Sequence, residues 1–291
     1  MKKVVTAWIL ALALIATGVF ALAEVPTQDR AGNPLAVPEK VETIASLAPS
    51  ITQVLIDLGL ADKIIAVDTY SAGSKGLDET LPAFEMMAPD MEQMIALNPD
   101  IVFVTGMSLS DGTDPFTALT DVGIAVAYIP SSNSIDGIME DNLFIGQVAG
   151  NAEGAKALND KLAAAIETFR VETDAPIPVY FEISPAPYLY SFGSGTFLNE
   201  MIELLGGKNI FVDQEGWISV SDEAVIAAAP EIIFTNVNWE EDAVEKILAR
   251  EGWESIPAVE NGKVFLIDAD ASSQANHRIV YALEEMAEVL K

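Results

Sequence analysis

The sequence predicts an α/β protein of two similar parallel-sheet lobes that are joined by one long rigid helix, with a ligand cleft between the lobes. Two observations support this fold class. Strand and helix patterns alternate along residues 41–134 and again along residues 176–291, an order that is typical of parallel sheets. Between these lobes, residues 135–175 lack a strand pattern and are expected to form a helical linker that includes the bridging helix.

A repeated unit supports the similarity of the two lobes. Residues 90–106 read DMEQMIALNPDIVFVTG, and residues 222–237 read DEAVIAAAPEIIFTNV. When Glu92 is aligned with Glu223, identical residues also coincide at Ile95 and Ile226, Ala96 and Ala227, Pro99 and Pro230, Ile101 and Ile232, and Phe103 and Phe234. Each copy contains a glutamate, a short apolar helix, a proline and a β-branched strand, which indicates an internal duplication.

The first lobe shows four strand patterns that alternate with helix patterns. Ser50 and Gln53 have the spacing of a capping box that starts the first helix, and Gly59 is expected to end it. The expected strands are residues 41–48, 64–67, 100–105 and 125–129, and the later helices are residues 91–97 and 116–124. This order predicts a parallel sheet.

The linker contains the longest helical pattern of the chain. Gly150 and Asn151 interrupt the linker, and residues from Ala152 to about Thr173 read as one helix. At 1.5 Å per residue this helix is about 33 Å long, which is enough to span a small domain. A continuous helix resists bending, so we expect only small hinge motions between the lobes.

The second lobe repeats the layout of the first. Its expected strands are residues 179–183, 208–212, 231–235 and 263–267, and its expected helices are residues 195–207, 222–229, 243–250 and 278–290. Ligands of parallel α/β sheets bind beyond the carboxyl ends of the strands. Two such ends that face each other therefore predict a cleft.

The N-terminal residues are predicted to lie outside the fold. Lys2 and Lys3 precede an apolar run, and residues 21–23 read Ala-Leu-Ala, so residues 1–23 match a cleaved secretory signal peptide. An uncleaved membrane anchor remains an alternative, because the run is nearly long enough to span a bilayer. Residues 24–40 are polar and rich in proline, and we expect an extended lead-in there.

Composition narrows the classes of function. The formal charge of −29 disfavours nucleic acid as a partner and favours a soluble monomer with basic partner surfaces. The sequence contains no cysteine, so it offers neither a disulfide nor a thiol that could carry a lipid. We therefore expect an unlipidated protein in the periplasm or another extracytoplasmic space.

Recognised catalytic and metal-binding patterns are missing from the sequence. Its single histidine, His277, cannot supply a multi-histidine metal site and is interpreted as a surface residue or as a residue that leads into a helix. No G-x-S-x-G motif is present, and the Gly193–Gly195 segment is not followed by the lysine of a P-loop. We expect neither an enzyme nor a bound metal or cofactor.

Large apolar side chains follow several predicted strands and are candidate ligand contacts. They are Tyr70, Met107, Tyr188, Tyr190, Phe192, Trp217 and Trp239. Rings in loops at one end of a sheet fit a broad, flat organic ligand. The alternative for each is ordinary packing within a lobe.

Glu92 and Glu223 lie in the first turn of the two repeated helices. A negative charge at that position is stabilised by the helix dipole, by about 0.3–1 kcal/mol, so dipole complementation alone is one interpretation. Because the two positions are equivalent in the repeat, they also predict one carboxylate on the rim of each lobe.

Five segments together resemble the helical-backbone substrate-binding proteins of ABC importers, the group that binds cobalamin, ferric siderophores and haem. They are KVETIASLAPSITQVLIDLGLADKIIAVDTYS, MEQMIALNPDIVFV, SGTFLNEMIELLGGKNIF, GWISVSDEAVIAAAPEIIF and HRIVYALEEMAEVL. The resemblance implies two lobes bridged by one helix and a permease dimer as partner. It also implies that Glu92 and Glu223 meet arginines of that permease, and that Tyr70 and Trp217 contact the ligand.

The ligand is narrowed by the arginines, and two other functions stay open. The predicted cleft loops contain none of Arg30, Arg170, Arg250 and Arg278. Anionic siderophores and haem propionates are commonly held by arginine forks, so a corrinoid or a neutral chelate is favoured over these ligands. The alternatives to transport are a secreted two-lobe enzyme and a sensor or adhesion module that has lost transport.

Overall fold

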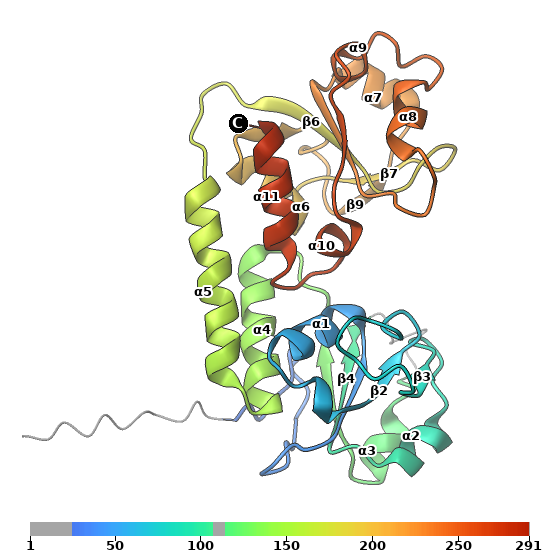
Figure 1. Ribbon diagram of the computed structural model, residues 1–291, viewed down its shortest axis with the longest axis vertical. Helices are drawn as coiled ribbons and strands as arrows, with labels where there is room; N and C mark the ends of the chain where they lie inside the picture. Colours follow the sequence, from blue (N-terminus) through green and yellow to red (C-terminus); the bar gives the residue numbers. More distant parts are fainter. Residues whose placement is uncertain (1–24, 107–113, 291) are drawn as a thin grey trace, which may run out of the picture.

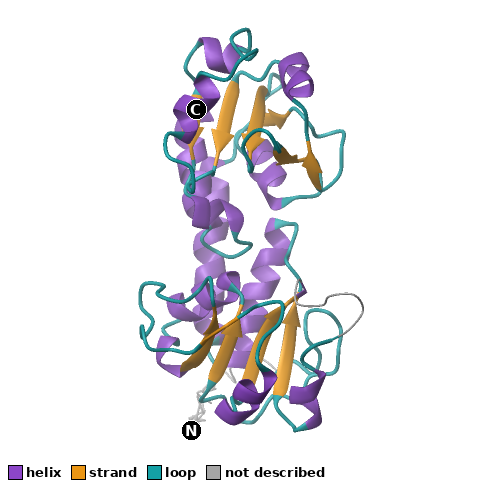
Figure 2. Ribbon diagram, turned by 90° about the vertical axis from the view of Figure 1, so that its right-hand side faces the viewer, coloured by secondary structure: helices purple, strands orange, loops and turns teal. Residues whose placement is uncertain are grey.

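The computed structural model describes residues 25–106 and 114–290. Two α/β lobes are stacked along the long axis of the molecule, and helices run along one side from lobe to lobe (Figures 1 and 2). The two-lobe α/β fold predicted from the sequence is confirmed.

The N-terminal lobe contains a five-stranded parallel sheet in the order β3-β2-β1-β4-β5. The strands are β1 (Ile44–Leu47), β2 (Ile64–Asp68), β3 (Ala83–Phe84), β4 (Ile101–Thr105) and β5 (Ala125–Ile129). Helices α1 (Pro49–Asp57), α2 (Met91–Leu97) and α3 (Thr117–Asp121) and the 3-10 turn η1 (Ala61–Lys63) belong to the same lobe. All residues of β4 are buried, as expected for an inner strand covered by helices on both faces.

The C-terminal lobe contains a four-stranded parallel sheet in the order β11-β10-β6-β8. Its strands are β6 (Ile177–Glu182), β8 (Gly207–Asn209), β10 (Ile232–Thr235) and β11 (Val264–Leu266). The helices are α6 (Phe197–Leu204), α7 (Asp222–Ala228), α8 (Ala243–Leu248), α9 (Pro257–Glu260), α10 (Ala269–Ser273) and α11 (Ile279–Leu290). A separate antiparallel ribbon pairs β7 (Tyr190–Phe192) with β9 (Trp217–Ser219), which the sequence analysis did not predict.

The connection between the lobes is a helical hairpin rather than one helix alone. Helix α4 (Ile135–Ala149) turns at Gly150 into α5 (Ala152–Phe169), which ends before the predicted limit near Thr173. Both helices contribute to both lobes: Ile138 and Leu162 belong to the core of the C-terminal lobe, whereas Phe144 and Ala155 belong to that of the N-terminal lobe. The bridge is therefore two helices thick and stiffer than the predicted single helix.

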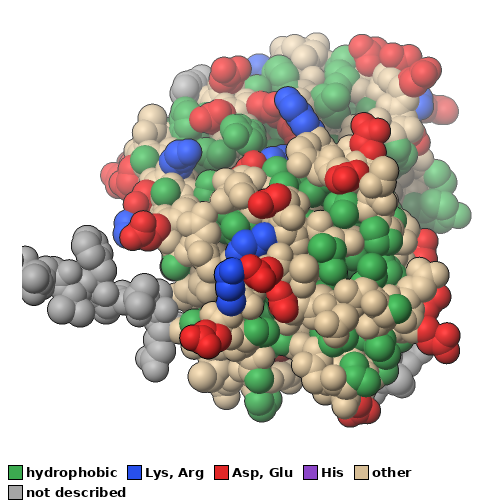
Figure 3. Space-filling view, turned by 60° about the horizontal axis from the view of Figure 1, so that its bottom comes forward, with side chains coloured by type: hydrophobic (Ala, Val, Ile, Leu, Met, Phe, Trp, Pro, Cys, Tyr) green, Lys and Arg blue, Asp and Glu red, His purple; other side chains and the backbone are tan. Residues whose placement is uncertain are grey.

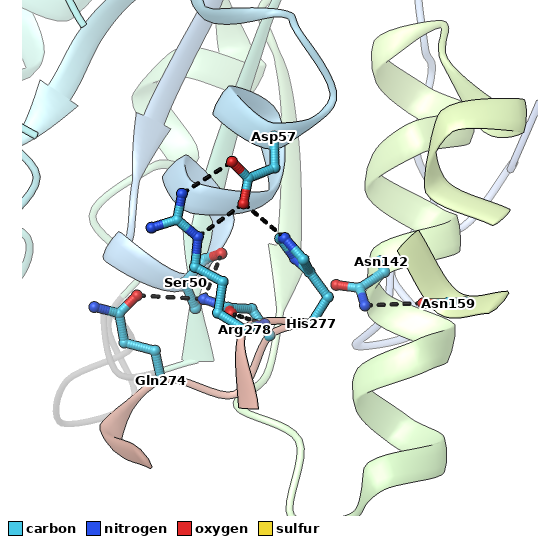
Figure 4. Close-up of polar contacts among 8 residues, drawn as sticks. Ser50, Asp57, Asn142, Asn159, Gln274, His277 and Arg278 are labelled. Carbon is cyan, nitrogen blue, oxygen red and sulfur yellow. Dashed lines mark hydrogen bonds and ion pairs between the residues drawn. The ribbon is translucent and has the colours of Figure 1, made fainter. Parts of the chain in front are cut away.

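Polar and steric contacts hold α4 against α5. The side chain of Asn142 donates to Asn159 Oδ1 at 2.9 Å (Figure 4). Asn159 Nδ2 in turn donates to the Met139 carbonyl at 2.6 Å. Near the turn, a Cβ atom on Gly146 would overlap the side chain of Ala155. The missing side chain at Gly146 thus permits the close approach of the two helices.

The repeated unit of the sequence forms the same structure twice. Helices α2 and α7 each have seven residues, and each ends at a left-handed residue, Asn98 with φ 49° and Ala229 with φ 48°. At their starts, Asp90 accepts a hydrogen bond from the Gln93 amide and Ser221 from the Ala224 amide. The structure therefore supports the internal duplication, including the capped helix starts.

The first helix begins differently from the prediction. Helix α1 starts at Pro49, its N-cap is Ala48, and no side chain caps it. Proline is favourable at the first helical position because its φ angle suits a helix and its missing N–H has no intrahelical acceptor there. The predicted capping box at Ser50 and Gln53 is wrong for this reason.

The lead-in covers the edge of the first sheet. The Arg30 amide donates to the Tyr128 carbonyl, and the Tyr128 amide donates to Asp29 Oδ2, both at 3.1 Å. The Arg30 side chain continues to Asp141 on α4, with Nε 2.6 Å from Oδ1. These contacts satisfy backbone groups on the outer side of β5 and tie the lead-in to the bridge.

Candidate ligand-binding and docking sites

The carboxyl ends of the two parallel sheets face each other across the space between the lobes (Figure 2). The loops after β2 and β10 lie at these ends, and they carry Tyr70 and Trp239, whose side chains are 75% and 64% exposed. Exposed rings at two facing sheet ends are the arrangement that the sequence predicted for a ligand site.

A buried polar network holds the loop that carries Tyr70. Asp68 is fully buried at the end of β2 and accepts hydrogen bonds from the amides of Tyr70 and Ser71 at 2.9 and 3.0 Å. The Ser71 hydroxyl also donates to Thr52 at 3.1 Å, and Thr52 lies 2.8 Å from the Ser46 hydroxyl. The backbone at Tyr70 is therefore fixed to the sheet while its ring projects into solvent.

Trp217 is exposed on one side and supported on the other. It opens strand β9 and is 41% exposed. Its ring meets Phe192 and Phe197 edge to face, with centroid distances of 5.8 and 6.2 Å. Phe192 itself is completely buried, so the prediction that it contacts the ligand is not supported by the structure. Phe192 faces the core from strand β7 and acts as a support for Trp217.

The remaining predicted aromatics lie after β6. Tyr188 is 83% exposed and Tyr190 is 37% exposed, and both line an open hollow of about 490 Å³ with Ser184, Pro187, Leu189, Ser219 and Val220. Met107, which was also predicted to contact the ligand, lies outside the described residues. The roles of Tyr70, Tyr188, Tyr190, Trp217 and Trp239 in binding stay predictions.

Glu92 and Glu223 are both exposed in the first turn of their helices. Helices α2 and α7 lie on the side of their lobes that faces away from the bridging helix α5 (Figure 1). Hydrogen bonds from the Glu223 backbone amide and from the Ser221 hydroxyl lower the pKa of Glu223, which keeps this carboxylate ionised. Each lobe thus has, on the side away from α5, a helix whose first turn carries an exposed carboxylate.

Acidic residues outnumber basic residues in the protein as a whole. The sequence has 44 acidic and 15 basic residues. Acidic side chains are spread over the end of the molecule formed by the N-terminal lobe (Figure 3). Such a surface favours a basic partner.

A buried ion pair in the C-terminal lobe was missed by the sequence analysis. Arg250 donates to both carboxylate oxygens of Glu182, at 2.7 and 2.9 Å, and the Glu182 side chain is 1% exposed. Burial raises the pKa of Glu182, and the adjacent guanidinium opposes that rise. The pair borders a pocket of about 170 Å³ that is also lined by Glu240, Lys246 and the apolar side chains of Pro185, Ala186 and Ala243.

Two further observations concern membranes and metals. Within residues 25–106 and 114–290, no helix combines the length and the apolar character that a membrane crossing requires. In the same ranges, no group of three or more acidic residues or histidines is arranged to hold a metal ion.

Two lobes that are linked by a rigid helical bridge, with aromatic rings at facing sheet ends, define a two-lobe binding protein with a helical backbone. The family model for the periplasmic binding protein matches residues 44–271. This chain belongs to that family, and the resemblance described above is confirmed.

Relatives and solved structures agree with this assignment. The uncharacterized ABC transporter substrate-binding lipoprotein YvrC of Bacillus subtilis is 30% identical over 91% of this chain and 84% of its own length. The vitamin B12-binding protein of Vibrio cholerae is 28% identical, over 88% of this chain and 92% of its own length. The crystal structure of a possible iron-binding, periplasmic solute-binding protein from Staphylococcus epidermidis superimposes with a TM-score of 0.75 at 29% identity, covering 86% of this chain and 99% of that one.

The comparisons support the expected class of protein and its location, but not the expected lack of a lipid anchor. The family and its members are binding proteins that serve ABC transporters, which agrees with the expected class and with an extracytoplasmic location. The expected lack of a lipid anchor stays a prediction, because the Bacillus subtilis relative is a lipoprotein by name.

Proposed function

We propose that this protein captures a cobalamin-like corrinoid or a ferric siderophore between its lobes and delivers it to the permease dimer of an ABC importer. It acts as a monomer outside the cytoplasm after cleavage of its signal peptide. The observation that carries the proposal is the pair of exposed rings, Tyr70 and Trp239, in loops at the sheet ends that face each other. A third exposed ring, Trp217, stands on the ribbon of β7 and β9 in the C-terminal lobe. Neither a secreted enzyme nor a sensor module is favoured by a comparable observation.

The arginines support a corrinoid or a neutral chelate over an anionic ligand. Every arginine of the sequence is already paired with a carboxylate of the chain itself: Arg30 with Asp141, Arg170 with Glu167, Arg250 with Glu182, and Arg278 with Asp57. Pairing leaves their guanidinium forks engaged, so propionate or catecholate groups would have to displace an internal partner. The Vibrio cholerae relative is a vitamin B12-binding protein by name, and the Staphylococcus epidermidis protein is named as possibly iron-binding.

The ligand class is tested by titrating the purified protein with cyanocobalamin, a ferric hydroxamate siderophore and haem. Binding is followed by quenching of tryptophan fluorescence, to which exposed Trp217 and Trp239 contribute. Saturable binding of the corrinoid or of the siderophore supports the proposal. Binding of haem alone, or of none of the three, contradicts it.

The first site prediction concerns Tyr70. Tyr70→Ala should weaken ligand binding by about 1–3 kcal/mol, because an exposed cleft ring buries its area only in the complex. The melting temperature should stay unchanged, since Tyr70 is 75% exposed in the free protein. Tyr281→Ala, at an exposed tyrosine on α11, is the matched control and should leave affinity unchanged. If Tyr70→Ala and Tyr281→Ala change ligand affinity equally, Tyr70 is not a ligand contact.

Trp217→Ala should have a similar effect on affinity but a different effect on stability. This ring packs against Phe192 and Phe197, so its loss should lower the melting temperature as well. Trp217→Phe retains part of both contacts and separates the two effects. Ligand affinity that is unchanged in both variants would return Trp217 to a purely structural role.

A further inference from the structure

The start of helix α7 is anchored to the interior of the C-terminal lobe. Asp222, the first residue of α7, accepts a hydrogen bond from Trp253 Nε1 to its Oδ1 at 2.7 Å. Trp253 is completely buried, and its ring meets Tyr180 of β6 edge to face with a centroid distance of 6.0 Å. The helix that presents Glu223 is thus tied to the sheet through one indole.

The indole is in turn held from the sheet by Arg250. The guanidinium carbon of Arg250 lies 4.2 Å from the centre of the Trp253 ring, which is within the range of a cation–π contact. The same guanidinium makes the two hydrogen bonds to Glu182, the last residue of β6. Contacts therefore run without a gap from the carboxyl end of β6 through Arg250 and Trp253 to Asp222, next to Glu223.

The N-terminal copy of the unit differs at this point. In the aligned repeat, Met91 stands where α7 has Asp222, so the start of α2 offers a thioether in place of a carboxylate. The two helices do share a capped start and one buried side chain: in α2 these are Asp90 and Met94. The internal anchor is thus a feature of the C-terminal copy.

We propose that Trp253 and Arg250 are positioning residues for the docking carboxylate Glu223. The indole N–H fixes the first turn of α7 through Asp222, and Arg250 fixes the indole against the end of β6. This inference rests on the proposed docking role of Glu223 and deepens it, because it explains how the C-terminal lobe holds one of its two contacts to the permease.

Trp253→Phe is the central test, because phenylalanine keeps a buried ring but lacks the N–H that donates to Asp222. Asp222→Ala removes the acceptor instead, and Asp222→Asn is the matched control that keeps an acceptor oxygen. We expect Trp253→Phe and Asp222→Ala to leave ligand affinity unchanged and to lower uptake in permease-containing liposomes about threefold or more. Asp222→Asn should have a smaller effect than either.

A double-mutant cycle separates positioning from a general structural effect. In a Glu223→Gln background, Trp253→Phe should cause no further loss of uptake, whereas in a Glu92→Gln background it should still cause one. The positioning role is overturned if Trp253→Phe and Asp222→Ala leave uptake unchanged, or if their losses add to the loss caused by Glu223→Gln. Either result leaves the proposed docking role of Glu223 intact. Full uptake by Glu223→Gln itself would overturn the proposed docking role.

A polar contact joins helix α1 of the N-terminal lobe to residues 276–278, which lead into α11 of the C-terminal lobe. Asp57, the last residue of α1, accepts hydrogen bonds from Arg278 Nε at 2.7 Å and from Arg278 Nη2 at 2.9 Å (Figure 4). His277 Nε2 lies 2.8 Å from the same carboxylate. The Asn276 side chain also donates to the Ser50 carbonyl at 3.4 Å. The segment that leads into α11 is thereby fastened to the N-terminal lobe.

His277 is buried in this contact with one nitrogen unpaired. Its side chain is 9% exposed, and among the described residues Nδ1 has no hydrogen-bond partner. The charged groups around it are Asp57 on α1, Lys161 on α5 and Arg278 beside it, and Tyr281 on α11 lines the same hollow of about 240 Å³. Burial lowers the pKa of His277, the Asp57 carboxylate opposes this, and Arg278 and Lys161 reinforce it.

We infer that Asp57, His277 and Arg278 form a latch between the lobes that is closed while His277 is neutral and loosens when His277 takes up a proton. A protonated ring would place a second N–H, at Nδ1, where no acceptor is present among the described residues. Since the pKa is lower in the latched state than in a released one, the released state binds more protons. The latch therefore loses stability as the pH falls below about 6.5, the ordinary histidine value.

The sequence makes this latch easy to test, because it contains one histidine and no cysteine. Val122 and Lys208 are exposed residues of the two lobes. Spin labels attached to the double variant Val122→Cys, Lys208→Cys report the distance between the lobes by double electron–electron resonance. We expect the distance distribution to broaden between about pH 7.5 and pH 5. His277→Gln, which keeps a donor for Asp57 but does not titrate, should remove this dependence, and Asp57→Ala should give the broad distribution at every pH.

Nuclear magnetic resonance of the single labelled histidine gives an independent readout. The pKa of His277 should lie below 6.5 in the intact protein, and Asp57→Ala, which opens the latch and relieves the burial of the ring, should raise it toward the ordinary histidine value. A distance distribution that does not change with pH overturns the inference. So does a His277 pKa at or above its ordinary value.

Discussion

Replacing both Glu92 and Glu223 with alanine should lower ligand uptake at least about tenfold, while the affinity of the isolated protein for its ligand stays unchanged. A permease dimer has approximate two-fold symmetry, so a binding protein that sits on it needs two similar and separated contacts. The structure offers such a pair, since both carboxylates are exposed in the first turn of capped helices on the side away from the bridge. The double variant should be worse than either single variant.

The controls for this experiment separate docking from the helix-dipole effect. Glu153 is also an exposed glutamate in the first turn of a helix, but it belongs to α5 in the bridge. Glu153→Ala should therefore leave uptake unchanged, although it removes the same interaction with a helix dipole. Uptake is measured in liposomes, and ligand affinity is titrated in parallel. Unchanged uptake in the double variant would return Glu92 and Glu223 to dipole partners, and lost ligand affinity would place them in the cleft.

The parts of the fold that depend on local sequence patterns could be predicted. The repeated unit sets a short amphipathic helix and a buried strand in each lobe, and the structure forms α2 with β4 and α7 with β10 accordingly. These elements were predictable because apolar spacing, a capping residue and a strand of β-branched residues all act within about fifteen residues of chain.

The parts that depend on contacts between distant residues could not be predicted. The ribbon of β7 and β9 pairs Phe192 with Trp217 across a long stretch of chain. The aromatic pattern identified both rings, but only the pairing shows that Phe192 faces the core while Trp217 remains exposed. The second bridging helix was obscured in the same way, because α4 becomes part of the bridge only by packing against α5.

The ion pair of Glu182 and Arg250 is the clearest example of a feature that sequence reasoning missed. Its partners are separated by 68 positions, and Glu182 stands in an ordinary strand pattern, VYFEI. A glutamate at a buried strand end is a usable signal in retrospect, because a carboxylate is rarely buried without a partner. Which arginine pairs with this glutamate cannot be predicted from the sequence unless the fold is known.

Arg250→Ala should destabilise the protein by about 3–5 kcal/mol, because it leaves the carboxylate of Glu182 buried and unpaired. The Glu182 side chain is 1% exposed, and the hydrogen bond from Tyr180, at 3.5 Å, is too long to replace a bidentate guanidinium. The loss also removes the cation over the Trp253 ring. Chemical denaturation at neutral pH measures the change in the free energy of unfolding.

The double variant Glu182→Gln, Arg250→Ala decides whether the unpaired charge is the cause. A neutral amide costs far less to bury than a carboxylate, so the double variant should recover part of the stability that Arg250→Ala loses. Protonation of Glu182 has the same effect as the amide. Burial raises the pKa of Glu182, and without Arg250 this rise is unopposed, so the defect of Arg250→Ala should shrink as the pH falls from neutrality. Two results would contradict this explanation: a stability defect of Arg250→Ala that does not shrink as the pH is lowered, or a double variant that is no more stable than Arg250→Ala. Either result would show that Arg250 stabilises the lobe through packing on Trp253 rather than by pairing with Glu182.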